Sequence, residues 1–164
     1  MENIIISLGS NLGDRKKFLE KSIYLLSKRL KLIDHSSVYE TKGFGVNDHP
    51  NYLNRVIFFK TNISFFSLLN YTKKIERKLG RFNKNDLTPR IIDIDIIFYG
   101  EKKIFRKNLI LPHKEFSQRP FVIAPFYEID TNQKKQLSIK FKNFLKKHKD
   151  LKFFLGDIIQ KVGK

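Results

Sequence analysis

Ile91-Ile92-Asp93-Ile94-Asp95-Ile96-Ile97-Phe98-Tyr99 is the clearest strand in the sequence, because every residue except the two aspartates is apolar. Gly100-Glu101 follows as a turn, and residues 103–105 are predicted to pair back as a hairpin strand. Side chains alternate along a strand, so Asp93 and Asp95 project from the same face with Cβ atoms about 7 Å apart. The strand therefore presents two carboxylates on one face.

The chain before this strand alternates between strand and helix patterns. Strands are predicted over residues 3–8, 35–41 and 52–60, and helices over residues 14–30 and 64–80. The helices have plausible ends, because Asp14 opens the first and Ser64 is an N-cap for the second. The order is βαββαβ plus a hairpin strand. This order favours a ferredoxin-like α+β fold, an antiparallel sheet with its helices packed on one face.

The rest of the chain is predicted to add helices. A short helix is expected over residues 120–127, with Pro120 in its first turn. Beyond Asp130 the chain is rich in lysine and phenylalanine, and it is predicted to form one or two surface helices. Because 164 residues suit one compact core, we expect a single domain over residues 1–164 with a basic tail at residues 131–164.

The composition limits the classes of function. The formal net charge is +17, which attracts nucleic acid, anionic lipid or a phosphorylated substrate. Dispersed lysines in a chain also rich in Ile, Asn and Phe are equally consistent with a solvated surface and AT-rich coding. The chain contains no cysteine, so thiolate chemistry is excluded. No apolar run approaches the roughly 18 residues that span a bilayer, so a cytoplasmic protein without membrane contact is expected.

Asp93 and Asp95 are the candidate chemical centre. Two like charges on an apolar strand need compensation, and Mg²⁺ suits hard oxygen ligands while the phosphates of a nucleotide complete its shell. The alternative is an amphipathic edge strand with both aspartates in solvent. The cationic residues on either side in sequence favour phosphoryl-type transfer. They are Arg81, Lys84 and Arg90 before the aspartates, and His113 and Arg119 after them.

A series of short motifs extends from about residue 4 to about residue 130. The motifs are Ile6-Ser7-Leu8-Gly9-Ser10-Asn11-Leu12-Gly13-Asp14, Tyr39-Glu40-Thr41, Tyr52-Leu53-Asn54, Ile75-Glu76-Arg77-Lys78-Leu79-Gly80-Arg81, Pro89-Arg90-Ile91-Ile92-Asp93-Ile94-Asp95-Ile96, Leu111-Pro112-His113 and Arg119-Pro120-Phe121. In order and spacing they resemble the 6-hydroxymethyl-7,8-dihydropterin pyrophosphokinase family of folate biosynthesis. The tail lies outside the resemblance.

This resemblance implies transfer of pyrophosphate from ATP to the hydroxymethyl group of a reduced pterin, with release of AMP. It assigns two Mg²⁺ ions to Asp93 and Asp95, and catalytic roles to Arg81, Arg90 and Asp95. The ATP-binding positions that it implies are Lys73, Glu76, Arg81, Lys84, Arg90, Ile96, His113 and Arg119. The pterin-binding positions that it implies are Thr41, Phe44, Tyr52, Asn54, Asp93 and Phe121. A monomer that binds small-molecule substrates and no nucleic acid is expected.

The sequence departs from the family pattern in loops around the nucleotide. Asn83 stands where a second arginine is common, and Leu87-Thr88 stands where Trp-Gly is common. Lys42-Gly43 replaces a frequent Pro-Pro, and Lys114 replaces a frequent aromatic residue. The polar, Gly-rich loops at residues 42–51 and 82–89 are predicted to close over bound ATP.

Two other classes of function compete with this interpretation. The βαββαβ order is also that of RNA-recognition modules, and Lys42-Gly43-Phe44-Gly45-Val46 imitates the start of their RNP1 signature. The sequence that follows ends in His49-Pro50 and cannot form the central strand that such a module needs. A non-catalytic scaffold is the third class. It predicts that Asp93→Asn and Asp95→Asn alter stability alone.

Overall fold

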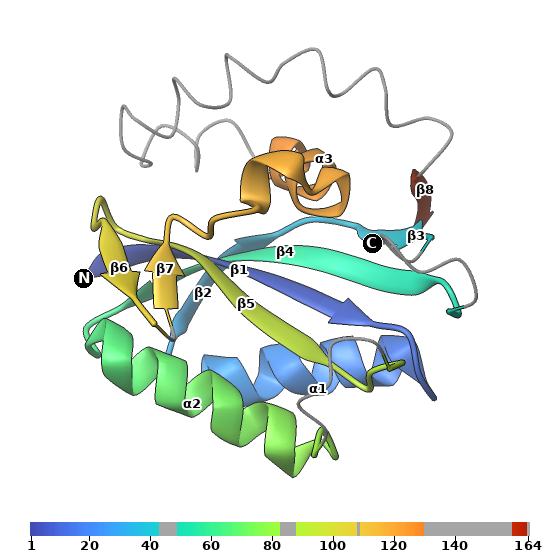
Figure 1. Cartoon of the computed structure of the whole chain (residues 1–164), viewed down its shortest axis with the longest axis horizontal. Coiled ribbons are helices and arrows are strands. Elements are labelled where there is room, and N and C mark those ends of the chain that lie inside the picture. The colour runs from blue at the N-terminus through green and yellow to red at the C-terminus, as the bar shows by residue number, and fades with distance from the viewer. Residues whose placement is uncertain (43–48, 83–87, 108, 130–158, 164) are drawn as a thin grey trace.

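An antiparallel sheet organises the chain in the computed structural model, which describes residues 1–42, 49–82, 88–107, 109–129 and 159–163 (Figure 1). Its strands follow the order β5-β1-β4-β3-β8, and β2 also pairs with β4. These strands are β1 (Glu2–Ser10), β2 (Lys31–His35), β3 (Val38–Thr41), β4 (Tyr52–Thr61), β5 (Asp93–Tyr99) and β8 (Ile159–Gly163). Strand β1 therefore lies between β4 and the edge strand β5.

Helices cover both faces of the sheet. Helices α1 (Arg15–Ser27) and α2 (Phe65–Lys78) pack on one face, and α3 (Pro120–Glu128) lies on the other (Figure 1). A 3-10 turn, η1 (Phe116–Gln118), precedes α3. The ferredoxin-like α+β prediction is confirmed, with α1 and α2 on one face as expected.

Most helix ends form where the sequence predicts them, although α1 ends at Ser27 and not at residue 30. The side chain of Asp14 accepts a hydrogen bond from the Lys17 amide at 3.1 Å, and Ser64 accepts one from the Ser67 amide at 3.2 Å. Gly80 follows the end of α2 with φ of +104°, a conformation that glycine adopts at low cost. Pro120 is the first residue of α3, where its missing N–H leaves no helical hydrogen bond unmade.

Alternation along the strands divides the core into two layers. On β1, Ile4, Ile6 and Leu8 pack with Leu19, Leu26, Leu68 and Ile75 of the two helices. Ile5 points the other way and packs with Val56, Phe58, Ile97, Val122 and Phe126 beneath α3. Ser7 and Gly9 follow Ile5 on this second face of β1. Neither residue belongs to the apolar cluster beneath α3. The second face is therefore apolar under α3 and polar beyond it.

The predicted strand at residues 35–41 is confirmed over β3 alone, because β2 occupies residues 31–35, before the predicted strand, and shares only His35 with it. Ser36 and Ser37 between them are fully buried. The Ser36 side-chain oxygen accepts the Val56 amide at 3.1 Å, and the Ser36 amide donates to the Val56 carbonyl at 2.9 Å. Because a side chain takes one place in the hydrogen-bond ladder, the register is broken there.

The predicted hairpin between β5 and residues 103–105 is wrong. Strand β6 (Ile104–Arg106) pairs instead with β7 (Leu109–Leu111), a strand that the sequence analysis did not predict. The amide of His113 donates to the Ile97 carbonyl at 3.0 Å. The segment after β7, and not β6, thus reaches the free edge of β5.

The predicted helical tail is also wrong at its described end. Residues 159–163 form β8, which pairs antiparallel with β3. The physical reason is the open edge of β3, whose backbone groups need partners that a strand can supply. Residues 131–158 and 164 of the predicted tail lie outside the described residues.

We predict that Leu8→Ala lowers the free energy of unfolding by about 3 kcal/mol, because it leaves a cavity at a fully buried site between the sheet and α1. Leu32→Ala is the matched control: Leu32 also lies on a strand but is 38% exposed, so a loss below about 1 kcal/mol is expected. Urea unfolding measures both. Equal losses would contradict the assignment of the core.

Candidate active site

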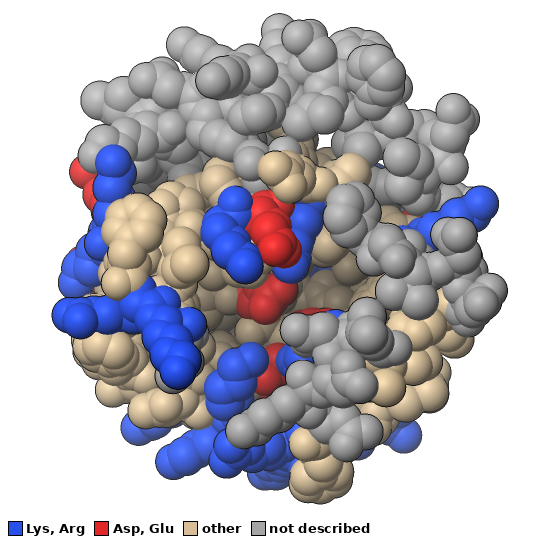
Figure 2. Space-filling model, in the orientation of Figure 1, with Lys and Arg blue, Asp and Glu red and all other residues tan. Residues whose placement is uncertain are grey.

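A pocket of about 530 Å³ opens on the polar part of the α3-side face. In Figure 2 acidic side chains lie near the centre of the surface shown, flanked by lysine and arginine. The pocket floor comes from three neighbouring strands, because Gly9 on β1 pairs with Asp93 on β5 and with Asn54 on β4. Strand spacing places Asp93 and Asn54 about 10 Å apart across Gly9. The floor thus has a carboxylate side and an amide side.

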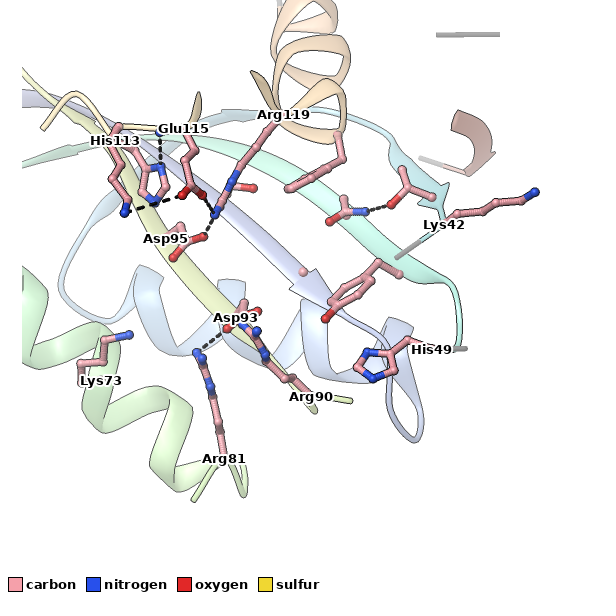
Figure 3. A pocket seen from close by; sticks show the side chains of 17 residues that line it. Lys42, His49, Lys73, Arg81, Arg90, Asp93, Asp95, His113, Glu115 and Arg119 are labelled. Atoms are coloured by element: carbon pink, nitrogen blue, oxygen red, sulfur yellow. Dashed lines mark hydrogen bonds and ion pairs between the residues drawn. The ribbon is translucent and has the colours of Figure 1, made fainter. Parts of the chain in front are cut away.

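Both aspartates of β5 point into this pocket, as the alternation predicts (Figure 3). Ile94 and Ile96, the residues between and after them, face the helices and belong to the core. The two carboxylates therefore share one face of one strand, and the edge-strand alternative with both groups in solvent does not describe them. Their side chains are 18% and 35% exposed.

Three arginines compensate the carboxylates from opposite sides (Figure 3). Arg90 contacts Asp93 Oδ2 at 2.6 Å, and Arg81 contacts the other oxygen of the same carboxylate. Arg119, which immediately precedes α3, donates to Asp95 Oδ2 at 2.9 Å. It also contacts Glu115 at 2.6 Å. In this structure the negative charge on β5 is thus balanced by guanidinium groups.

Glu76 on α2 holds two of the cations in place. It is 3% exposed, it pairs with Lys73 at 2.9 Å and with Arg81, and it accepts the Ile94 amide at 2.9 Å. One buried carboxylate thus ties α2 to β5 and orients Arg81 toward Asp93. Its contribution is to position the cationic groups.

Burial opposes the ionisation of Asp93 in spite of its two arginine partners. Burial, reinforced by the negative charge of Asp95, raises the pKa of Asp93 to about 6 although Arg81 and Arg90 act in the opposite direction. The ionised form of Asp93 is therefore incompletely stabilised. A further cation at this position would favour it.

His113 lines the pocket as a neutral ring. Burial lowers the pKa of His113, Arg119 acts in the same direction, and Asp95 opposes them. Its Nδ1 accepts the Glu115 amide at 3.3 Å, so the neutral ring carries its proton on Nε2. The imidazole can therefore donate one hydrogen bond into the pocket.

The amide side is built from β3, β4 and the start of α3. Asn54 donates through Nδ2 to the Thr41 hydroxyl at 2.7 Å, and both residues are 3% exposed. Tyr52 and Phe121 also line the pocket. A Cβ atom at Gly9 would lie 3.2 Å from Asn54 Oδ1 and 3.6 Å from Tyr52 Cδ1. Glycine at this position thus leaves room for both side chains.

Most predicted site residues meet in this single pocket. Those that line it are Thr41, Tyr52, Asn54, Lys73, Arg81, Arg90, Asp93, Asp95, His113, Arg119 and Phe121. Of the other predicted residues that the structure describes, Glu76 is buried behind Arg81, and Ile96 is 4% exposed in the core. Phe44 and Lys84, most of the two predicted closing loops and most of the RNP1-like segment lie outside the described residues.

The pocket also has lining residues that the sequence analysis did not assign to it. They are Ser7, Gly9, Lys42, His49, Lys114 and Glu115. Ser7 and Gly9 alternate with buried Leu8, and their place opposite Asp95 and Asp93 follows from the pairing of β1 with β5. The alternation along β1 can be predicted from the sequence, but the register of its pairing with β5 cannot. Ser7 and Gly9 were therefore not predicted as lining residues.

The donor chemistry fits Mg²⁺. Asp93 and Asp95 offer carboxylate oxygens from one face, and this ion commonly binds through one or two carboxylates together with substrate phosphates. In the described part of the chain no group of three or more acidic, histidine or cysteine side chains forms a metal cage. The residues present therefore suit an ion that arrives with a phosphorylated substrate.

The fold and the pocket together define an α+β enzyme of the phosphoryl-transfer class, because cationic groups and two carboxylates converge beside an apolar sheet. A family model described as 7,8-dihydro-6-hydroxymethylpterin-pyrophosphokinase (HPPK) matches residues 5–131. The chain belongs to this family, which confirms the resemblance drawn from its motifs.

Curated relatives agree with this membership. The 2-amino-4-hydroxy-6-hydroxymethyldihydropteridine pyrophosphokinase of Bacillus subtilis is 39% identical over 132 residues, which are 79% of this chain and 79% of that protein. Its counterpart in Aquifex aeolicus is 38% identical over 80% of this chain and 82% of that protein. The folate synthesis bifunctional protein of Arabidopsis thaliana is 40% identical, but this chain covers 27% of its length.

Solved structures support the fold. A Plasmodium falciparum HPPK-DHPS triple mutant solved with STZ-DHP superposes with a TM-score of 0.69 at 16% identity. The match covers 98% of this chain and 46% of that one. At this identity the likeness extends to the fold alone.

Among the described residues no helix is long and apolar enough to cross a membrane.

We predict that Glu76→Ala lowers the free energy of unfolding by about 3 kcal/mol, because it strips a partner from Arg81, from Lys73 and from the Ile94 amide. Lys73→Met is the matched control. It removes one half-exposed partner of the same carboxylate, so a loss below about 1 kcal/mol is expected. Thermal or urea unfolding measures both. An unchanged stability of Glu76→Ala would contradict the tie between α2 and β5.

Proposed function

We propose that this chain transfers pyrophosphate from ATP to the hydroxymethyl group of 6-hydroxymethyl-7,8-dihydropterin, a step of folate biosynthesis. The observation that carries the proposal is the shared pocket: two carboxylates and three arginines on one side, and a buried amide with two aromatic side chains on the other. Such a pocket offers one region for a charged polyphosphate and another for a flat polar ring.

The carboxylate side suits the triphosphate of ATP. Arginine forks bind phosphate oxygens in pairs, and Lys73 and the Nε2 proton of His113 add single donors. In this structure Arg81, Arg90 and Arg119 are held by Asp93 and Asp95. We infer that they exchange these carboxylates for phosphate oxygens when the nucleotide binds. Two Mg²⁺ ions held by Asp93 and Asp95 would neutralise phosphate charge and clamp the reacting oxygens.

The amide side suits the pterin. Asn54 keeps its Oδ1 free of the Thr41 bond, and Thr41 adds a hydroxyl, so both can meet the donor and acceptor edge of the ring. Tyr52 and Phe121 are the aromatic groups available to its faces. Gly9 lies between the two sides of the pocket and has no side chain to fill the floor. The hydroxymethyl arm of the pterin would extend across this position toward the phosphates.

The reaction that we propose is an in-line displacement at phosphorus. The pterin hydroxyl oxygen bonds to the β-phosphorus, and the bond from that phosphorus to the oxygen it shares with the α-phosphate breaks. The products are AMP, the pterin diphosphate and one proton released to solvent. The chain's residues orient both substrates and balance charge, which is most of what phosphoryl transfer requires.

We further infer that the enzyme acts as a monomer in the cytoplasm on small-molecule substrates. The support for a monomer is that several elements of one chain line the pocket together. They are β1, β3, β4, α2, β5 and the start of α3. Since β8 joins the same sheet as β1, we also propose one domain over residues 1–164.

Product analysis tests the function directly. We expect the purified chain, incubated with ATP, Mg²⁺ and the hydroxymethyl pterin, to form AMP and pterin diphosphate in equal amounts by liquid chromatography. Omitting the pterin should suppress AMP, and chelating the metal should abolish turnover. Formation of ADP in place of AMP would defeat the proposal.

We predict that Asp95→Asn lowers the turnover rate at least about a hundredfold, since it removes a charged ligand from the metal-binding pair. The substitution keeps the size of the side chain, so circular dichroism should show a folded protein. Asp34→Asn on β2 is the matched control, because the same change outside the pocket should leave turnover unaltered. A merely two- or threefold slowing of Asp95→Asn would contradict the metal role.

A further inference from the structure

Strand β8 adds to the sheet from beyond the family-matched residues. The family model ends at residue 131, whereas β8 occupies Ile159–Gly163. It pairs with β3 through Tyr39 opposite Lys161, Glu40 opposite Gln160 and Thr41 opposite Ile159. On its other side β3 pairs with β4 at Tyr39, Glu40 and Thr41. The short strand that carries Thr41 is therefore held between β4 and the end of the chain.

Glu128, the last residue of α3, joins the same elements. Its carboxylate accepts the Ser37 amide at 2.8 Å, the Ser37 hydroxyl at 2.5 Å and the Tyr39 hydroxyl at 3.0 Å. Lys161 of β8 contacts the same carboxylate at 2.6 Å. One acidic group thus connects α3 and β8 to β3 and to the residue just before it.

These elements carry the walls of the amide side of the pocket. Thr41 at the end of β3 accepts the hydrogen bond of Asn54, and Phe121 lies in the first turn of α3. A shift of β3 relative to β4 would move the Thr41 hydroxyl and release the amide of Asn54. The carboxylate side depends on α2, β5 and Arg119, and β8 has no pairing with β5.

We propose that β8 is a positioning element of the pterin subsite: its pairing with β3 and the contact of Lys161 with Glu128 fix Thr41 and, through it, the amide of Asn54. This inference rests on the function proposed above. Lys161 and Glu128 do not line the pocket, so they act on the substrate through Thr41.

The charge state of Glu128 is consistent with this arrangement. Burial would raise the pKa of Glu128, but hydrogen bonds from Lys161, Ser37 and Tyr39 outweigh burial and lower the pKa to about 2. The carboxylate is therefore ionised throughout the neutral range and available to Lys161. Since the folded pKa lies below the usual value near 4.5, this junction stabilises the fold above that pH and loses its effect as the pH falls toward 2.

Two matched charge reversals in the full-length chain test the proposal. Lys161→Glu places a second carboxylate against Glu128, and Lys102→Glu does the same against Glu2, away from the pocket. Both lysines are about half exposed, and both variants change the net charge equally. The change in net charge is thus the same in both variants, and KM for ATP reports any change in the attraction of the nucleotide.

We expect Lys161→Glu to raise KM for the pterin about five- to tenfold, in the range of common coupling energies, while KM for ATP stays within about twofold. Lys161→Arg should keep the wild-type KM, and Lys102→Glu should change neither constant. Hydrogen exchange should become faster at the amides of β3 in Lys161→Glu. A chain without residues 159–164 should likewise show a raised KM for the pterin and a KM for ATP within about twofold of the wild-type value.

An unchanged KM for the pterin in both Lys161→Glu and the shortened chain would overturn the inference. So would a parallel rise of both KM values, because that is what general loosening of the fold produces. A wild-type chain that forms no AMP defeats the proposed function instead. In that case hydrogen exchange still decides whether β8 fixes β3, since unchanged exchange in Lys161→Glu contradicts it and faster exchange supports it.

Discussion

The alternation of side chains along three adjacent strands is the constraint on which the rest of this molecule depends. On β5, Ile94 and Ile96 enter the core while Asp93 and Asp95 face the other way. On β1 and β4 the same face changes along the strand from apolar beneath α3 to polar beyond it. Because Gly9 of β1 lies opposite both Asn54 of β4 and Asp93 of β5, these polar ends coincide. The pocket is the uncovered continuation of the second hydrophobic core.

Charge balance explains the arrangement around that floor. Two carboxylates one residue apart on a buried strand repel each other, and each guanidinium that approaches them lowers this cost. The arginines are themselves held by Glu115 and by buried Glu76. Acidic and basic groups thus alternate outward from β5. The network keeps the arginines oriented toward the place where a nucleotide's phosphates are proposed to bind.

The sequence predicts the elements and the chemistry of this protein better than their connections. Caps at Asp14 and Ser64, alternation at Asp93 and Asp95, and the βαββαβ order are local signals, and the structure agrees with them. The break at Ser36 depends on a hydrogen bond to Val56, twenty residues away. The pairing of β6 with β7 and the recruitment of residues 159–163 to β3 depend on which strand edges stay open. Such competition for edges is not encoded in any short window.

The long sequence separation between β3 and β8 bears on how the sheet is assembled. Strand β1 cannot gain both neighbours until residues 93–99 have been made, and β3 waits for residues 159–163. Contacts of such long sequence separation form slowly, because a large loop must close before any pairing energy is gained. During synthesis the half of the sheet that carries Asp93 can therefore become ordered while the Thr41 edge is still open. Residues 159–163 must emerge from the ribosome before that edge can pair.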